Sequence, residues 1–392
     1  MVRGFYILPA RPLEGKGYLC IRMAENENFF APALERWFAD NARDLPWRHT
    51  REAYKIWVSE IILQQTRVAQ GYDYYMRFVE RFPDVQSLAS AQDDEVMKYW
   101  QGLGYYSRAR NMLAAARDIA VRFGGTFPSH YDDIRSLKGI GDYTAAAIAS
   151  IAYDLPYAVL DGNVYRVLSR LFDIDLPIDD AAGKRYFSEL ADTLLHREKP
   201  GLYNQAMMEL GALVCLPSGT LCDKCPIASH CAAYAAGTVS QRPVKQGKVA
   251  VKHRYFHYFV IMHRGDTWLH RREADDIWRN LYEFPLIETP APSSLSLLRR
   301  TDEYAALLGD AGKLTFLAPP FECRHVLTHR IIHAVFYVVE AEALPASVRD
   351  MRRVPWGRVG EYAVSRLTDN FLQHCATGLW NGMSAIWDGG EK

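Results

Sequence analysis

The sequence lacks a net charge, a long apolar run, an internal repeat and a low-complexity tract. Its 46 Lys+Arg balance 46 Asp+Glu, so total charge does not single out a nucleic acid or an anionic membrane as partner. No apolar run reaches the length of a membrane span, and the first residues lack the apolar segment of a secretory signal. We therefore expect a cytoplasmic protein with no membrane partner.

Local charge is more informative than the total. Residues 31–235 hold 22 Lys+Arg against 26 Asp+Glu, whereas residues 236–256 hold five basic residues and no acid. Recognition of a polyanion would therefore depend on where charges are placed. Residues 1–28 are interpreted as an N-terminal extension. Their basic residues are also typical of a transit peptide, and Met23 is an alternative natural start.

Cysteine is scarce, and its distribution excludes a disulfide framework. Of seven cysteines, four lie close together with the spacing C-x6-C-x2-C-x5-C: Cys215, Cys222, Cys225 and Cys231. An odd total with one tight group indicates a metal site in a reducing compartment. Tetrahedral zinc and a cubane iron–sulfur cluster both suit four thiolates, although zinc more often uses two C-x2-C pairs. Four reduced core thiols are the simplest alternative.

The chain is long enough for two domains, and its residue pattern changes once along the sequence, from helical spacing to strand-like runs. Residues 29–237 repeat apolar side chains at helical spacing and predict an all-α domain. Residues 238–252 are polar and basic and predict a linker. Residues 253–375 contain two runs rich in β-branched and aromatic residues, 255–261 and 334–339, with a helical segment at 295–308 between them. They predict an α+β domain, followed by a tail at 376–392.

One short turn could hold a phosphate. Residues 137–148 read L-K-G-I-G-D-Y-T-A-A-A-I, in which Gly139 and Gly141 open an alanine-rich helix. Glycines let the backbone turn tightly, and the N–H groups at a helix start attract anions. An ordinary helix–turn–helix corner would have the same pattern.

Two carboxylates lie in helical segments whose surroundings could give them different pKa values. Residues 57–66 read W-V-S-E-I-I-L-Q-Q-T, and on a helix Glu60 would share an apolar face with Ile56, Leu63 and Gln64. Partial burial there would raise its pKa. Residues 159–168 read V-L-D-G-N-V-Y-R-V-L, in which Asp161 can cap a helix and stay ionised through N–H donors. A solvated glutamate and an ordinary helix cap are the alternatives.

Together these motifs resemble the MutY-type adenine DNA glycosylases of the endonuclease III-like superfamily. The catalytic helix at residues 57–66, the helix-hairpin-helix at 137–148 and the cysteine loop occur in that family's order, and the likeness extends from about residue 29 to 371. The resemblance implies an all-α glycosylase domain with one 4Fe–4S cluster on the four cysteines. It also implies a Nudix-like second domain.

The resemblance also assigns roles to the acids and their neighbours. It makes Glu60 the acid that protonates adenine N7 and Asp161 the base that stabilises the sugar cation. Asn163 would organise that network and Tyr143 would face the same pocket. Bifunctional relatives carry a lysine where this chain has Tyr143. The resemblance therefore implies a monofunctional enzyme.

Further positions carry over as DNA contacts. The resemblance implies that Gln65 wedges into the base stack with Thr66 as its neighbour, and that Tyr105 inserts beside 8-oxoguanine. It places Arg48, in P-W-R, in the adenine pocket. It places Gly139 and Gly141 in the turn that binds a DNA phosphate.

The second domain resembles the family's lesion-sensing domain. Residues 278–285 read W-R-N-L-Y-E-F-P, and residues 325–329 read H-V-L-T-H, where the family usually has Phe-Ser-His at the end. Thr328 can donate the same hydroxyl hydrogen bond as serine, and His329 matches, but the family's phenylalanine is replaced by Leu327.

The expected substrate is duplex DNA with adenine opposite 8-oxoguanine or guanine, bound by a monomer. A bifunctional glycosylase/lyase would need lysine at position 143. A Nudix pyrophosphatase would need its catalytic signature after Pro285, where L-I-E-T-P stands instead. A non-catalytic iron–sulfur DNA-binding protein could dispense with Glu60 and Asp161, and a redox iron–sulfur protein would leave both acids without a role.

Overall fold

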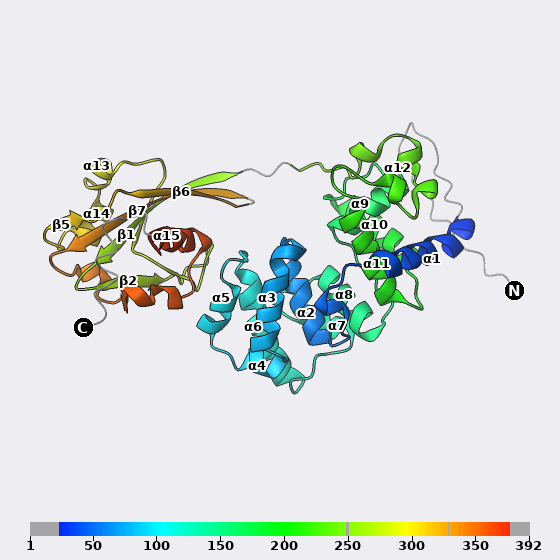
Figure 1. The fold of residues 1–392 in the computed structure, drawn as a ribbon, viewed down its shortest axis with the longest axis horizontal. Coiled ribbons are helices and arrows are strands. Elements are labelled where there is room, and N and C mark those ends of the chain that lie inside the picture. The colour runs from blue at the N-terminus through cyan, green and yellow to red at the C-terminus, as the bar shows by residue number, and fades with distance from the viewer. Residues whose placement is uncertain (1–22, 248–250, 328, 377–392) are drawn as a thin grey trace. The chain divides into compact units, whose positions relative to one another are not determined.

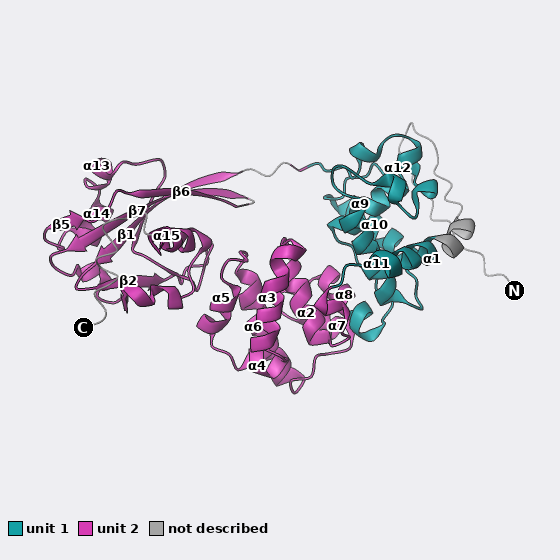
Figure 2. Ribbon diagram, viewed as in Figure 1, with its two compact units in different colours: residues 1–44, 149–246 teal, residues 45–148, 247–392 magenta. Residues whose placement is uncertain are grey.

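The computed structural model describes residues 23–247, 251–327 and 329–376 (Figure 1). The chain forms two compact units, each built from separate stretches of sequence (Figure 2). Unit 1 comprises residues 1–44 and 149–246, and unit 2 comprises residues 45–148 and 247–392. Among the described residues, no helix is long and apolar enough to cross a membrane.

Unit 1 is helical, and its central helix is α11. This helix begins with Pro200, whose fixed φ suits a first helical position, and it packs against α1 and α9. The side chains of Asp161 and Asp180 cap α9 and α10 by accepting backbone N–H bonds. Its helices are α1 (Met23–Asn41), α9 (Gly162–Leu171), α10 (Ala181–Leu194), α11 (Pro200–Leu213) and α12 (Ala232–Ala235), with short 3-10 turns η2 (Cys222–Lys224), η3 (Ala228–His230) and η4 (Val239–Gln241).

The first part of unit 2 is also helical. Its core contains large, fully buried aromatic side chains such as Trp57, Phe78 and Trp100. Eight of the eleven residues of α2 are buried, which fixes this helix on nearly all sides. The elements are η1 (Pro46–Arg48), α2 (Ala53–Leu63), α3 (Val68–Arg81), α4 (Val85–Ala89), α5 (Asp93–Trp100), α6 (Ser107–Arg122), α7 (Tyr131–Ser136) and α8 (Asp142–Tyr153), the last of which continues into unit 1.

The second part of unit 2 is an α+β domain with two sheets. The larger sheet has the order β4-β1-β7-β5, with β6 also paired to β7, and the smaller has the order β3-β2-β8. The long strands β1 and β7 run parallel, and the register places Phe259 beside Tyr337. The strands are β1 (Lys252–Met262), β2 (Asp266–Arg271), β3 (Tyr282–Glu283), β4 (Leu286–Thr289), β5 (Leu314–Phe316), β6 (Phe321–Val326), β7 (Arg330–Ala341) and β8 (Arg352–Pro355), and the helices are α13 (Leu295–Leu298), α14 (Asp302–Leu308), α15 (Arg366–Ala376), η5 (Ala346–Val348) and η6 (Trp356–Glu361).

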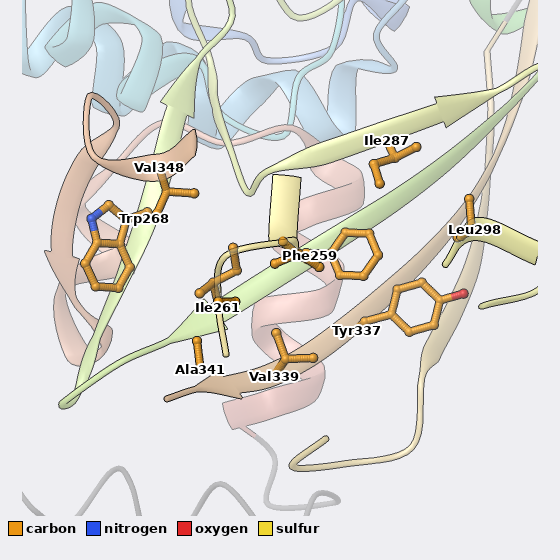
Figure 3. Packing of buried hydrophobic residues seen from close by; sticks show 11 residues of the cluster. Phe259, Ile261, Trp268, Ile287, Leu298, Tyr337, Val339, Ala341 and Val348 are labelled. Atoms are coloured by element: carbon orange, nitrogen blue, oxygen red, sulfur yellow. The ribbon is translucent and has the colours of Figure 1, made fainter. Parts of the chain in front are cut away.

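Side chains on both faces of the larger sheet are buried. On one face, alternate residues of β1 and β7 form a cluster with Trp268, Ile287 and Leu298 (Figure 3). On the other face, α15 covers β7, where the rings of Phe336 and Phe371 stack with centroids 4.3 Å apart. Burial on both faces explains why β1 and β7 are apolar over most of their length.

The predicted order, an all-α part followed by an α+β domain, is confirmed. Two local predictions are wrong. Gln64 does not lie on the catalytic helix, because α2 ends at Leu63 and Gln64 has an extended ψ of 115°. The segment 295–308 is not one helix but two, because Thr301 caps a new helix, α14. The domain bounds stay a prediction.

Candidate active site

Glu60 and Tyr143 meet in unit 2, although 83 residues separate them. Glu60 is half-buried on α2, and Tyr143 stands in the first turn of α8. The Tyr143 hydroxyl donates a hydrogen bond of 2.6 Å to Glu60 Oε2. A phenol that donates to an oxygen of a carboxyl group restricts the rotamer of the acid. Packing of α2 near α8 therefore brings two of the predicted site residues together.

The turn after α2 holds Gln65 in a rare conformation. Gln65 is exposed and has a φ of 57°, in the left-handed region that non-glycine residues seldom adopt. Gln64 anchors the turn by donating from Nε2 to Thr144 Oγ1 at 3.3 Å, and the Thr66 N–H bonds to the Leu63 carbonyl at 3.1 Å. Exposed residues with a strained backbone of this kind are concentrated at functional sites.

Tyr105 occupies a second strained turn, between α5 and α6. Its side chain is 49% exposed and its φ is 46°, next to Gly104 with φ 73°. The indole N–H of Trp100 donates to the Gly104 carbonyl at 3.1 Å, which ties the end of α5 to the turn. Both predicted wedge residues, Gln65 and Tyr105, therefore project from turns with left-handed backbones.

Arg108 links these two turns, and sequence reasoning missed this role. Its guanidinium donates to the carbonyls at the end of α2 (Ile61, Ile62 and Gln64, at 2.7, 3.0 and 2.6 Å) and to those of the Tyr105 turn (Leu103 and Gly104, at 3.3 and 3.2 Å). Burial lowers the pKa of Arg108 to about 10. The Arg108 side chain is buried, and its guanidinium donates to backbone carbonyls. The only sequence signal was an arginine close to two tyrosines.

The hairpin before α8 has the expected geometry. Gly139 has a φ of 84°, and a Cβ there would lie 2.7 Å from the Cβ of Asn111, so glycine is required. A Cβ at Gly141 would meet nothing within 4 Å, so this position is open to an approaching group. The side chain of Lys138 is exposed beside it. An exposed helix start with a nearby cation is suited to an anion.

Arg48 follows a buried aromatic residue in the sequence. Trp47 in η1 is buried, and its ring packs edge-on against Tyr75 with centroids 5.0 Å apart. Arg48 follows it and is half-buried. The sequence motif P-W-R therefore forms a short fixed turn that presents the arginine.

Asp161 caps α9 in unit 1, as predicted. Its Oδ1 accepts the backbone N–H groups of Asn163 and Val164 at 2.9 and 2.8 Å, and its Oδ2 accepts the Asn163 amide at 2.7 Å. The pKa of Asp161 is nevertheless raised above the ordinary aspartate value, because desolvation by the surrounding protein outweighs the three hydrogen bonds and the charge of Arg166.

Arg166 was not singled out from the sequence. It acts on Asp161 indirectly, through a hydrogen bond to the side chain of Asn163. Its Nη2 donates to Asn163 Oδ1 at 2.9 Å, and its Nε donates to the Cys215 carbonyl at 2.7 Å. Arg166 thus joins the amide that orients Asp161 to the start of the cysteine loop. Arg166 and Arg170 lie four residues apart on α9 and both bond to Cys215, a contact that no pattern in the sequence indicated.

The four clustered thiols are reduced and half-buried. They lie close enough for the charges of Cys215, Cys222 and Cys231 to act on the pKa of Cys225, which burial raises to about 11. Arg170 donates to Cys215 Sγ at 3.3 Å. Within the described parts of the chain, no group of three or more His, Cys, Asp or Glu side chains is arranged to hold a metal ion. Several thiols that share a desolvated pocket with cations and N–H donors nevertheless fit a thiolate-bound cluster, whose irons each take one cysteine.

In the C-terminal domain, the β6–β7 hairpin carries the predicted lesion-sensing residues. Leu327 N–H bonds to the Arg330 carbonyl at 2.8 Å, and His329 is exposed at the tip. Thr328 lies outside the described residues. The loop before β3 has left-handed residues at Trp278 and Asn280, with φ values of 63° and 67°.

The predicted site residues divide between the two units. Unit 2 holds Glu60, Tyr143, the two wedge residues, Arg48 and the hairpin glycines, and unit 1 holds Asp161, Asn163 and the four cysteines. Each set is described within its own unit. Convergence of Glu60 and Asp161 on one cavity stays a prediction.

Known protein families match both the helical part and the C-terminal domain of the chain. Residues 58–190 match the HhH-GPD superfamily of base excision DNA repair proteins, and residues 257–374 match the NUDIX domain. Among solved structures, a thermostable thymine-DNA glycosylase superposes with a TM-score of 0.50 at 26% identity, covering 55% of this chain and 99% of that one.

Relatives in sequence are adenine DNA glycosylases of bacteria and eukaryotes. The protein from Buchnera aphidicola subsp. Schizaphis graminum is 34% identical over 261 residues, covering 66% of this chain and 75% of its own. The Homo sapiens protein is 43% identical over 232 residues, covering 55% of this chain and 42% of its own. With the two matched domains in this order, the chain belongs to the adenine DNA glycosylase family.

Proposed function

We propose that this protein hydrolyses the N-glycosidic bond of adenine mispaired with 8-oxoguanine or guanine in duplex DNA, and that it does not cut the strand. The observation that carries this proposal is the hydrogen bond between Tyr143 and Glu60. It places a phenol, which forms no Schiff base, beside the acid at the position where bifunctional relatives have lysine.

In this mechanism, Glu60 gives its proton to adenine N7, so that the base leaves as a neutral molecule with the electron pair of the broken bond. Tyr143 holds the carboxyl group in place. Asp161, ionised, stabilises the positive charge that develops on the sugar. Water adds its oxygen to C1′ and loses one proton, which gives free adenine and an abasic site.

The DNA contacts follow from the exposed, strained turns. Extruding the base costs a few kcal/mol, and wedge residues offset this cost by filling the stack. Gln65, with Thr66 beside it, and Tyr105 serve this role, because both wedges are exposed on fixed turns. Arg48 lines the adenine pocket, and Gly139 and Gly141 let a phosphate approach the start of α8.

Recognition of the opposing base belongs to the C-terminal domain in this proposal. Thr328 and His329, which lie between β6 and β7 in the sequence, donate hydrogen bonds to 8-oxoguanine. The exposure of His329 is consistent with such a contact.

We further propose one 4Fe–4S cluster bound by Cys215, Cys222, Cys225 and Cys231, with zinc as the alternative metal. When bound, such a cluster crosslinks the loop between these cysteines. The shared burial of the thiols and the hydrogen bond from Arg170 support this assignment. We place the enzyme in the cytoplasm, on the nucleoid if the source is bacterial, and we propose that it acts as a monomer.

The test is a glycosylase assay on duplexes that differ only in the base opposite adenine. We expect adenine release from A:8-oxoguanine and A:G pairs, and none from the Glu60→Gln variant. Strand nicking without added base or heat would favour a bifunctional glycosylase/lyase. Absence of release from every duplex, with DNA binding retained, would favour a non-catalytic DNA-binding protein.

A further inference from the structure

The C-terminal domain contacts the turn that carries Tyr105, within unit 2. The hydroxyl of Tyr106 donates to the Val364 carbonyl at 3.3 Å. Gln101 bonds to the same domain twice: its Nε2 donates to Asp369 Oδ1 at 3.0 Å, and its Oε1 accepts the Val364 N–H at 3.4 Å. The turn at residues 101–106 is thus bonded to a segment more than 250 residues away.

The same two side chains also bond to the turn or to the helix before it. Tyr106 is 4% exposed, and its hydroxyl accepts the Gly102 N–H at 3.3 Å. Lys98, on α5, donates to Gln101 Oε1 at 3.0 Å and to the Tyr362 carbonyl at 3.3 Å. Tyr106 and Gln101 therefore each have partners on the helical part and on the C-terminal domain, so the two sets of contacts support each other.

Contacts also reach the helices on either side of the turn. On α5, Asp94 accepts a hydrogen bond of 2.9 Å from Tyr282 and forms an ion pair of 3.2 Å with Arg271. On α6, Arg110 donates to the Arg279 carbonyl at 2.8 Å. The C-terminal domain thus contacts the turn and both helices that it joins.

The turn needs such support because its backbone is strained. Gly102, Gly104 and Tyr105 all have positive φ values, of 96°, 73° and 46°. A tyrosine in the left-handed region costs free energy, and such conformations persist only where surrounding contacts enforce them. Part of that enforcement comes from the C-terminal domain.

We propose that Tyr106 and Gln101 are positioning residues through which the docked C-terminal domain holds Tyr105 in the conformation that enters DNA. This inference rests on the proposed role of Tyr105 as a wedge. The C-terminal domain then aids recognition in a second way besides its β6–β7 hairpin. Because a side chain ordered in advance loses less entropy on binding, the contact strengthens DNA binding and leaves the chemical step unchanged.

The first test measures hydrogen–deuterium exchange in the full-length protein without DNA. Asp369→Ala and Tyr106→Phe each remove a bond between the turn and the C-terminal domain, and Glu303→Ala, an exposed carboxylate on α14, is the matched control. We expect about fivefold faster exchange of amides in residues 99–107 in both variants, as for loss of one net hydrogen bond. Unchanged exchange there, or equal acceleration in strand β1, would overturn the proposal.

The second test uses a duplex with 2-aminopurine next to an A:8-oxoguanine pair, whose fluorescence rises when the neighbouring stack opens. Both variants should bind with a Kd about fivefold higher and give a smaller fluorescence rise, while the rate of adenine release at saturating enzyme stays at the wild-type value. Faster exchange with an unchanged Kd and fluorescence would sink the inference. If the wild-type protein released no adenine, the proposed activity would fail, and exchange and insertion would still decide this inference.

Discussion

The hydroxyl of Tyr143 lies 2.6 Å from Glu60 Oε2, and this contact defines the acid side of the candidate active site. Tyr143 comes from the helix that follows the hairpin, and Glu60 comes from a helix buried on nearly all sides. The contact joins the helix that follows the hairpin to the proposed proton donor, so in the proposed function docking of DNA on the hairpin and placement of the acid depend on the same helix.

Removing the phenol should slow catalysis without abolishing it. Tyr143→Phe loses a hydrogen bond worth about 0.5–1.5 kcal/mol, so the single-turnover rate should fall by about two- to tenfold. Glu60→Gln should leave no measurable adenine release. Tyr153→Phe, on the same helix, should behave as wild type. A Tyr143→Phe rate equal to wild type would show that the bond does not position the acid.

The pH dependence of the reaction should report Asp161. Its pKa is raised because desolvation outweighs its hydrogen bonds, so the proton is lost at a higher pH than for an ordinary aspartate. Asn163→Ala removes one donor to the ionised form and should shift the acid limb of the rate profile to higher pH. Asn41→Ala, an exposed amide on α1, should leave the limb in place. A shift of that limb to lower pH would contradict the assignment.

The same shift has a consequence for stability. A carboxyl whose folded-state pKa lies above its unfolded value destabilises the folded protein once it ionises. The penalty at Asp161 should therefore be absent below the unfolded pKa and complete above the folded one. Asp161→Asn should raise the Tm at neutral pH and have less effect in acid. A lower Tm at neutral pH would oppose this account.

Arg108 should be more important for structure than its neighbours on α6. Arg108→Lys keeps the charge but cannot reach the carbonyls of both turns, which leaves buried acceptors unpaired at a cost of about 2–3 kcal/mol. The free energy of unfolding should fall by that amount in denaturant titrations. Arg117→Lys, on the exposed face of the same helix, is the control. Equal stability of the two variants would rule out the link between turns.

The cysteine loop can be tested with a matched cysteine elsewhere. Cys222→Ser should lower bound iron, visible absorbance and Tm together, because one thiolate ligand is lost. Cys323→Ser changes a half-buried thiol of the C-terminal domain and should alter none of the three. Zinc in place of iron by elemental analysis would replace the cluster with a tetrahedral site.

Lesion sensing should depend on one hydroxyl. Thr328→Ala should reduce the preference for A:8-oxoguanine over A:G, because the hydrogen-bond donor to the lesion is lost. Thr328→Ser retains the hydroxyl and should preserve the preference. An unchanged ratio of single-turnover rates in Thr328→Ala would remove this residue from the sensing role.

The sequence alone was sufficient for features that depend on neighbours in the chain. Helical periodicity predicted the all-α part, runs of β-branched and aromatic residues predicted β1 and β7, and Asp161 before a helical run predicted its cap. These features are local because a helix, a strand or a cap needs only a few adjacent residues to satisfy its hydrogen bonds.

The tertiary structure decided what depends on contact between distant segments. It placed Tyr143 against Glu60, buried Arg108 between two turns and bonded Tyr106 to Val364, across separations of 83, up to 47 and 258 residues. It also set the direction of the pKa shift at Asp161, because desolvation depends on all the atoms packed around a group and no local pattern records them.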